Sequence, residues 1–568
     1  MRAPVTLLLA LALLAASAGP GEGARSPRKP AVSKARVGKA PSRSRVRVPR
    51  RGLAARPVIE AARPALARKP AGRIEVAVHA HPSQDGWFDA FMSAPDETPL
   101  GKLAMKGGAL TGEMPRASKF SLSVTWYVEG FGHLWLEADN GGRLYRPGQA
   151  TGLQLNYELA RSRVRRNQRV LRRYRKGGLA VPDEVRRRQE EAASLFAEAG
   201  DARSDSERAA LSDRSLALAL RAGEELELAW ARHQQSRPGW QRPRLGADSR
   251  HYWVGPWQEI DKHIFQLLDI ATITHYDADT WAPHFQPSEG KLRWGLLEDI
   301  YDWLAGRRVE VVARPIFWPH DSVTPAFLRA KSFPELKTYV VEHATRMVEH
   351  WGPRVTHWEI ANEMHDWANV HDLDPQQTTE LIKLIAKTVR RLQPGAVLVV
   401  NNTYVFGEYA GLDQTAQGPG KRPLRTPYRF IADLVDAGVD FDVIGLQFYH
   451  PIRDLSDTVR LFEKFETFGK RIWISEAGAP SAETPQGMRL RGQVPTETLQ
   501  ADWAENLFRV AGARASVDAL LWYDISDNRN FTPSGGLLSS DGTPKEVFHR
   551  LVALKREWEA RSSSGSPD

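Results

Sequence analysis

The chain has 568 residues, a net charge of +10 and no cysteine, so disulfide bonds and Cys-ligated metal sites are excluded. The positive charge lies in residues 1–73, which hold 17 Lys and Arg residues against two acidic ones and leave residues 74–568 with a net charge of −5. A nucleic-acid-binding protein needs a basic face on its folded part, so this distribution excludes nucleic acid as a partner.

The first residues have the pattern of a secretory signal peptide. Met1 and Arg2 precede an apolar run over residues 5–16, and residues 16–18 match the small-x-small pattern of a cleavage site. The run is too short to span a bilayer comfortably, so we expect no transmembrane segment, with a retained anchor as the alternative. We therefore expect residues 1–18 to be a signal peptide and the protein to be secreted, periplasmic or at the cell surface.

Residues 19–73 are rich in Arg, Lys, Pro and Ala. Such a composition cannot bury enough apolar surface to offset the entropy of ordering, so it predicts a disordered basic linker. The linker is either a solvated spacer or a segment that adheres to acidic polymers or phospholipid at a cell surface.

Residues 74–157 show apolar and polar residues in alternation, for example over 74–78, 120–124 and 133–137. Alternation over five residues is typical of half-buried strands, so the segment predicts a small β-sandwich-like domain. Two interpretations remain open: a carbohydrate-binding module, or a structural domain packed against the rest of the chain. The candidate platforms for sugar rings are the tryptophans Trp87, Trp126 and Trp135.

A charged segment follows at residues 158–235. Its Arg, Glu, Ala and Leu residues recur with helical periodicity over 158–175, 183–199 and 207–232. We expect these helices to be a spacer or packing element rather than a ligand site.

Residues 240–558 repeat a pattern of apolar strand, loop and amphipathic helix. The predicted strands are residues 245–249, 270–276, 309–318, 356–362, 397–404, 441–449, 471–475 and 519–525. Eight such units predict an α/β fold, a (β/α)8 TIM barrel. A doubly wound sheet is the competing architecture, but no Gly-rich phosphate loop follows the first strand.

Two glutamates, Glu363 and Glu476, stand at the ends of the fourth and the seventh predicted strands. In a parallel barrel the carboxyl ends of the strands form the active-site face. Most glycoside hydrolases use a pair of carboxyl groups that face one cleft. One carboxyl group must be protonated and the other ionised.

Several motifs resemble glycoside hydrolase family 10, the endo-β-1,4-xylanases. Residues 358–363, Trp-Glu-Ile-Ala-Asn-Glu, resemble the Trp-Asp-Val-Val-Asn-Glu stretch of that family, and residues 474–476 resemble its Ile-Thr-Glu nucleophile strand. The other similar motifs are residues 286–290, 443–447, 536–538 and 541–545. The resemblance covers roughly residues 240–555 in the family's order and does not extend to residues 1–155.

The resemblance implies roles for individual residues. Glu363 would be the acid/base and Glu476 the nucleophile of a retaining double displacement. The residues that would hold the sugar are Asn362, Gln447 and His450, with Trp522 as the floor of that subsite. Trp281 and Trp318 match tryptophans after the family's second and third strands, and Arg314 stands where the family has a histidine. These three are further candidate substrate contacts.

The sequence also departs from the family. The run over residues 276–281 lacks the family's sugar-binding lysine, His450 is displaced by one position, and Gly478 replaces an aspartate. The catalytic pair is kept while the polar lining of the cleft is changed. Because unpaired polar groups in a cleft discriminate strongly between sugars, the substitutions bear more on substrate choice than on the reaction type.

The leading hypothesis is a retaining glycosidase that cleaves internal β-1,4 bonds of a polysaccharide, xylan in the first place. The alternatives are a β-xylosidase, another β-glycanase, or a catalytically idle sugar-binding barrel. We expect a monomer without a cofactor. We also expect no metal ion, because the spacing of His275, His320 and His450 matches no ligand motif.

Overall fold

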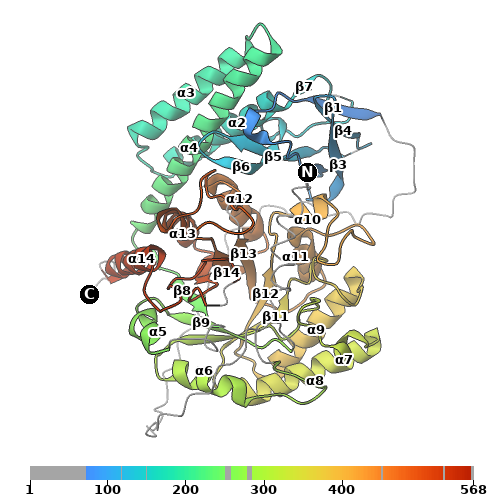
Figure 1. Cartoon of the computed structure of the whole chain (residues 1–568), viewed down its shortest axis with the longest axis vertical. Coiled ribbons are helices and arrows are strands. Elements are labelled where there is room, and N and C mark those ends of the chain that lie inside the picture. Colours follow the sequence, from blue (N-terminus) through green and yellow to red (C-terminus); the bar gives the residue numbers. More distant parts are fainter. Residues whose placement is uncertain are drawn as a thin grey trace.

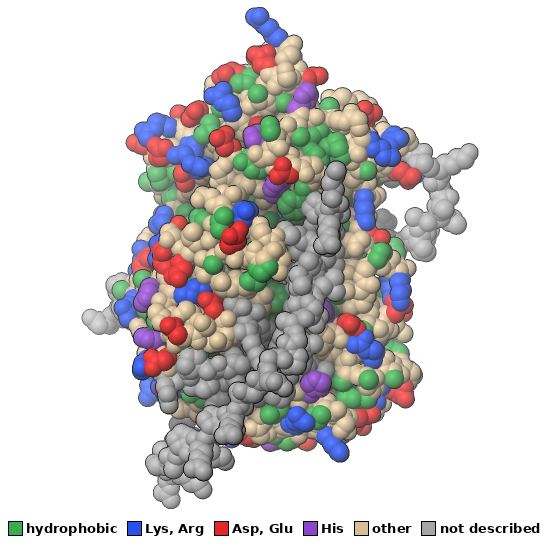
Figure 2. Space-filling view, viewed as in Figure 1, with side chains coloured by type: hydrophobic (Ala, Val, Ile, Leu, Met, Phe, Trp, Pro, Cys, Tyr) green, Lys and Arg blue, Asp and Glu red, His purple; other side chains and the backbone are tan. Residues whose placement is uncertain are grey.

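The computed structural model describes residues 72–116, 118–148, 150–249, 257–277, 284–449, 452–528 and 531–563. The predicted signal peptide and nearly all of the basic linker lie outside these residues. A strand domain and three helices occupy one end of the molecule, and the barrel occupies the other (Figure 1). Acidic and basic side chains are interspersed over the described part of one face (Figure 2), without a large patch of either sign.

The strand domain is one continuous seven-stranded sheet. Its strands are β1 (Arg73–Ala77), β2 (Ala90–Ser93), β3 (Pro99–Lys106), β4 (Ala109–Glu113), β5 (Ser121–Val128), β6 (Gly132–Ala138) and β7 (Leu153–Gln154), in the order β6-β5-β2-β3-β4-β1-β7. A strand-rich domain was predicted here and is present. Its sheet is continuous because β3 is long enough to pair with β2 along its first half and with β4 along its second half.

Three helices follow the sheet, as the periodicity predicts: α2 (Leu155–Lys176), α3 (Asp183–Gly200) and α4 (Asp205–Gln235). Ser204 caps α4, because its side chain accepts a hydrogen bond from the backbone of Glu207. Leu159 and Leu220 pack into the core of the sheet. Farther along α4, Ala231 packs against barrel helices, so the segment joins the two parts of the molecule.

The predicted barrel is confirmed. Its eight strands are β8 (Arg244–Asp248), β9 (Ile270–Thr274), β10 (Glu310–Arg314), β11 (His357–Asn362), β12 (Val397–Asn402), β13 (Val443–Tyr449), β14 (Arg471–Gly478) and β15 (Val517–Trp522). Each pairs in parallel with its neighbours in the chain, and β15 pairs with β8 to close the ring. Closure excludes the doubly wound sheet.

Helices surround the strands. They are α5 (Trp257–His263), α6 (Gly295–Ala305), α7 (Ala326–Arg329), α8 (Phe333–Trp351), α9 (Pro375–Leu392), α10 (Glu408–Gly411), α11 (Pro427–Asp436), α12 (Leu455–Glu466), α13 (Glu497–Gly512) and α14 (Glu546–Ser563). No helix in the described residues is long and apolar enough to cross a membrane.

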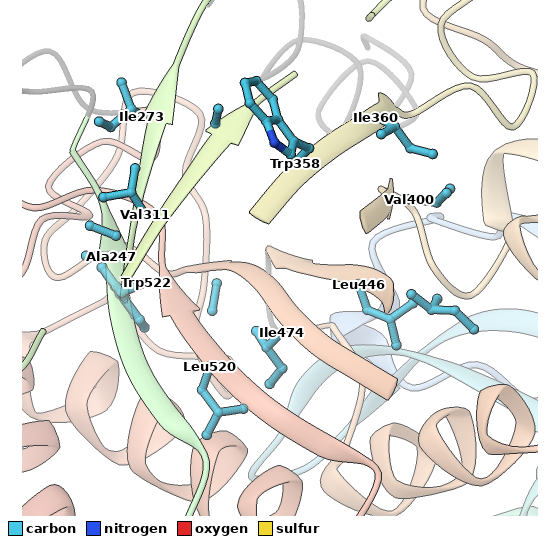
Figure 3. Close-up of a cluster of buried hydrophobic side chains, with 14 of the residues drawn as sticks. Ala247, Ile273, Val311, Trp358, Ile360, Val400, Leu446, Ile474, Leu520 and Trp522 are labelled. Atoms are coloured by element: carbon cyan, nitrogen blue, oxygen red, sulfur yellow. The ribbon is translucent and has the colours of Figure 1, made fainter. Parts of the chain in front are cut away.

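Barrel strand residues alternate between two buried layers. The outer layer packs against the helices and is apolar, as Ile273, Val311, Ile474 and Leu520 illustrate (Figure 3). The inner layer is apolar only in part, in a cluster composed of strand residues such as Trp473. Toward the carboxyl ends of the strands the inner positions become polar, and this change marks the site.

Candidate active site

A cleft of about 250 Å³ opens where the barrel strands end. Glu363 and Glu476 both line it, as the sequence predicts, together with Asn362 and Gln447. Residues of the strand domain line the same cleft, among them Asp89 and Leu134. The cleft is therefore composite, with the barrel as its floor and the strand domain as part of its wall.

Irregular pairing directs the side chains into the cleft. The register shifts on β11 between Glu359 and Ala361, and on β14 between Ile474 and Glu476 opposite β13 and between Ile474 and Ala477 opposite β15. A local shift turns a side chain away from strict alternation. Glu363 itself has a φ of 53°, a left-handed conformation that is uncommon for a residue other than glycine.

Gln447 joins the two glutamates. Its Nε2 donates to Glu363 Oε1 at 3.0 Å and to Glu476 Oε1 at 3.1 Å. Because both oxygens accept from one nitrogen, they lie no more than about 6 Å apart. That limit lies below the roughly 6.5–9.5 Å that separates the carboxyl groups of inverting glycosidases and admits the roughly 5–5.5 Å of retaining ones.

Glu476 is held by donors on both oxygens. Besides Gln447, its Oε1 accepts from Asn401 Nδ2 at 2.8 Å and from Arg314 Nη2. Its Oε2 accepts from Tyr449 OH at 2.6 Å. The side chain is 4% exposed, so these donors take the place of water around a carboxylate charge.

Arg314 is the central cation of the site and is 1% exposed. In addition to Glu476, it lies 3.4 Å from Glu359 and 3.5 Å from Asp248. One guanidinium thus faces three carboxyl groups. Burial raises the pKa of Glu359 to about 8 against the opposing effect of the Arg314 charge, so this carboxyl is protonated at neutral pH.

Glu363 is also a protonated acid at neutral pH. Burial in the cleft raises its pKa to about 8, and the negative charge of Glu476 adds to the effect. The side chain is 8% exposed. The two glutamates therefore meet the opposite requirements of a proton donor and an anionic partner, and the arrangement suits acid-assisted nucleophilic chemistry.

The structure distributes the predicted substrate contacts differently from the prediction. Asn362 and Trp318 line the cleft, as expected. Arg314 borders the cleft but is bound to Glu476, so it supports that carboxylate and is not a free sugar ligand. Trp522 is wrong as a subsite floor: it is fully buried in the outer layer, where its Nε1 donates to Gly535 O at 2.8 Å.

Strand alternation explains the error at Trp522. Leu521 belongs to the inner layer, so Trp522 points outward to the helices and the next residue, Tyr523, lines the cleft. The predicted contacts His450 and Trp281 lie outside the described residues.

Sequence reasoning missed Tyr449 and Asn401, both of which bind Glu476. The period of two along a strand could have found Tyr449, because it lies two residues after Gln447 in the same predicted strand. In the described residues, no three His, Cys, Asp or Glu side chains are grouped so that they could hold a metal ion.

The chain resembles known proteins over the barrel. The family model described as Glycosyl hydrolase family 10 matches residues 262–554. Endo-1,4-beta-xylanase 1 of Arabidopsis thaliana is 20% identical over 278 residues, or 48% of this chain and 26% of that protein. Anti-sigma-I factor RsgI6 of Acetivibrio thermocellus is 22% identical over 287 residues, or 50% of this chain and 33% of that protein.

The chain thus spans only a quarter to a third of the length of these two relatives. Among solved structures, native xylanase 10B from Thermotoga maritima is 16% identical, with a TM-score of 0.45; the match covers 58% of this chain and 98% of that one.

Proposed function

The chain belongs to glycosyl hydrolase family 10, and on that premise we propose that it is a retaining glycosidase that cleaves internal β-1,4 bonds of xylan. The observation that carries the proposal is the pair Glu363 and Glu476, held within about 6 Å by the shared donor Gln447. The spacing supports double displacement, because it leaves no room for a water molecule between the sugar and the second carboxylate.

In the first step, the glycosidic oxygen accepts a proton from Glu363 as its bond to the anomeric carbon breaks. An oxygen of Glu476 forms a bond to the same carbon, which gives a covalent glycosyl-enzyme and frees the leaving end of the chain. The pKa of about 8 keeps Glu363 protonated for this step at neutral pH.

In the second step, Glu363 acts as the base. Once Glu476 is esterified it carries no charge, so one of the causes that raises the pKa of Glu363 disappears. Glu363, which gave its proton to the leaving group in the first step, therefore stays ionised more readily and accepts a proton from the water molecule that attacks the anomeric carbon. Hydrolysis returns both glutamates to their first state.

The choice of xylan rests on the relatives. Several curated relatives carry the name Endo-1,4-beta-xylanase, at 20–24% identity. Two residues differ from the family pattern at the point that touches the nucleophile: Arg314 and Tyr449 take part in binding Glu476. These differences concern how the nucleophile is held, so the sugar itself is left to the test below.

The test is reducing-sugar release from a panel of soluble β-1,4-linked polysaccharides, followed by analysis of product length and anomeric configuration. We expect oligomers, with retention of configuration, and the highest rate on xylan. Release of monomers alone would indicate a β-xylosidase, and a higher rate on another polymer would replace the substrate. Polysaccharide binding without hydrolysis would establish an idle sugar-binding barrel and refute the proposed reaction.

A further inference from the structure

We propose that the strand domain carries a second glycan-binding surface that continues the active-site cleft. Its members are the rings of His81, Trp87, Tyr127 and His133, which we call the aromatic ledge. The occupant is a further stretch of the polysaccharide that the cleft binds, so the inference rests on the proposed function.

The four rings form a connected row. Tyr127 stacks on His81 with centroids 4.7 Å apart and an interplanar angle of 19°. His133 lies 5.5 Å from Tyr127 and 5.1 Å from Trp87. His81 is exposed and the other three are half-buried, so the row keeps ring surface open to solvent. Partly exposed rings with polar edges can serve as a ligand surface, because a sugar ring offers a flat C–H face to such rings.

The ledge is tied together from beneath by Gln84, which is 1% exposed. Its Oε1 accepts a hydrogen bond from the backbone of Tyr127 at 2.7 Å, and its carbonyl lies 3.3 Å from His133 Nε2. The rings are therefore fixed before any ligand arrives, which lowers the entropy cost of binding.

The ledge meets the cleft at Asp89. Trp87 Nε1 donates to Asp89 Oδ2 at 2.7 Å, and Asp89 lines the cleft that contains Glu363. Leu134, the neighbour of His133 in β6, lines the same cleft. A carboxylate beside a row of rings provides an acceptor for sugar hydroxyls where the two surfaces join.

The ledge also has a fixed position relative to the barrel. Trp135 N donates to Ile452 O at 2.9 Å, which joins β6 to the loop before α12. Arg163 of α2 forms a bidentate ion pair with Asp454, at 2.8 and 2.5 Å, at the start of α12. Figure 1 shows β6 next to α12.

Two glycines approach each other closely across this seam. Both Gly132 and Gly492 have positive φ, and a Cβ on Gly132 would lie 2.6 Å from the backbone of Gly492. A seam this tight excludes the mobility of a tethered module.

The proposal replaces two of the three predicted platforms. Trp126 and Trp135 are 1% and 0% exposed, so neither can present a face to a sugar. Of the three tryptophans, only Trp87 belongs to the ledge.

The experiment compares polymer binding by the full-length chain and by Tyr127→Ala. Tyr157→Ala is the matched control, because Tyr157 is also half-buried and stacked, at 4.8 Å and 25° from Phe196, but lies on α2 outside the cleft. Binding to soluble xylan and to the rest of the panel is measured by affinity electrophoresis, which does not require turnover. Circular dichroism verifies the fold of each variant, and Trp87→Ala is a second ledge variant.

We expect Tyr127→Ala and Trp87→Ala each to weaken polymer binding roughly 3- to 10-fold, while Tyr157→Ala binds like the unmodified protein. The ratio of kcat/KM on polymer to kcat/KM on a short aryl glycoside should fall in the ledge variants. Unchanged binding in both ledge variants, or equal losses in the control, would overturn the proposal. A chain that binds polymers through the ledge but hydrolyses none would refute the proposed function alone.

Discussion

The outer and the inner layers of the barrel are made by the same eight strands and obey opposite rules. Outer side chains such as Ile360 and Leu520 are apolar, and each makes many contacts that another apolar side chain could replace in part. Inner side chains at the carboxyl ends, such as Arg314 and Glu359, are ionisable and are matched to particular partners. The fold thus depends on many contacts that tolerate substitution, and the chemistry depends on a few contacts that do not.

The largest expected effect comes from the inner layer. Glu476→Gln removes the anionic nucleophile but keeps the shape of the side chain, so kcat should fall by at least about 10⁴-fold. The variant should remain folded, as judged by its circular dichroism and thermal midpoint. Activity within tenfold of the unmodified enzyme would show that another residue is the nucleophile.

Removal of the central cation should damage the fold. Arg314→Met leaves the carboxyl groups of Glu476, Glu359 and Asp248 without their shared partner, and such a loss in a buried site costs about 3–5 kcal/mol in the free energy of unfolding. Chemical denaturation measures the change. If the loss were under about 1 kcal/mol, the cluster around Arg314 would tolerate substitution as the outer layer does.

Tyr449→Phe removes one hydrogen bond, at 2.6 Å, from Glu476 Oε2. A hydrogen bond to a charged group contributes about 1.5–3 kcal/mol, so we expect kcat to fall roughly 10- to 100-fold. The effect should appear in kcat more than in KM, because Tyr449 positions the nucleophile. A change confined to KM would mean that its hydroxyl binds the sugar instead.

The pH dependence should reveal Glu363. Because the acid works only when protonated, kcat/KM should decline as the pH rises through its pKa of about 8, by about tenfold for each further pH unit. With an aryl leaving group that needs no proton, Glu363→Ala should lose this alkaline limb. A limb that persists in the variant would belong to a different group.

The same measurement needs a stability control. Glu359 and Glu363 bind protons more tightly in the folded chain than at the ordinary value of 4.5, so the free energy of unfolding declines as the pH rises from about 4.5 to about 8 and levels off above that. Circular dichroism at pH 9 should still show a folded protein.

The smallest effect is expected in the outer layer. Ile360→Val removes one methylene group from a fully buried position and should cost about 0.5–1.5 kcal/mol in the free energy of unfolding, with kcat unchanged. Chemical denaturation and an activity assay test the two halves of this expectation. A loss of kcat here would mean that the outer layer also shapes the site.

The outer layer was easier to predict from the sequence than the inner layer. Apolar runs of strand length and helical periodicity suffice for eight β/α units, and the strand-end position drew attention to Glu363 and Glu476. The inner partners were harder, because a register shift on β14 just before Glu476 changes which side chains of that strand face inward. No short-range pattern indicates that Arg314 would bind a glutamate 162 positions away.

The strand domain was predictable as strands but not as a wall of the cleft. Alternation identifies β5 and β6, yet the contact of Trp135 with Ile452 joins residues more than 300 positions apart. Such contacts depend on how two folded parts meet, and composition carries no information about that.

The glycine pair at the seam has a consequence for protein engineering. Any L-amino acid at Gly132 or Gly492 would be strained at a positive φ, and its Cβ would have to displace the opposing backbone. The catalytic barrel therefore cannot be treated as a cassette: excised, it would expose Asp454 and Asp457 without their arginines. A barrel fused to a different domain would need a glycine on that domain opposite Gly492, and two buried arginines opposite Asp454 and Asp457.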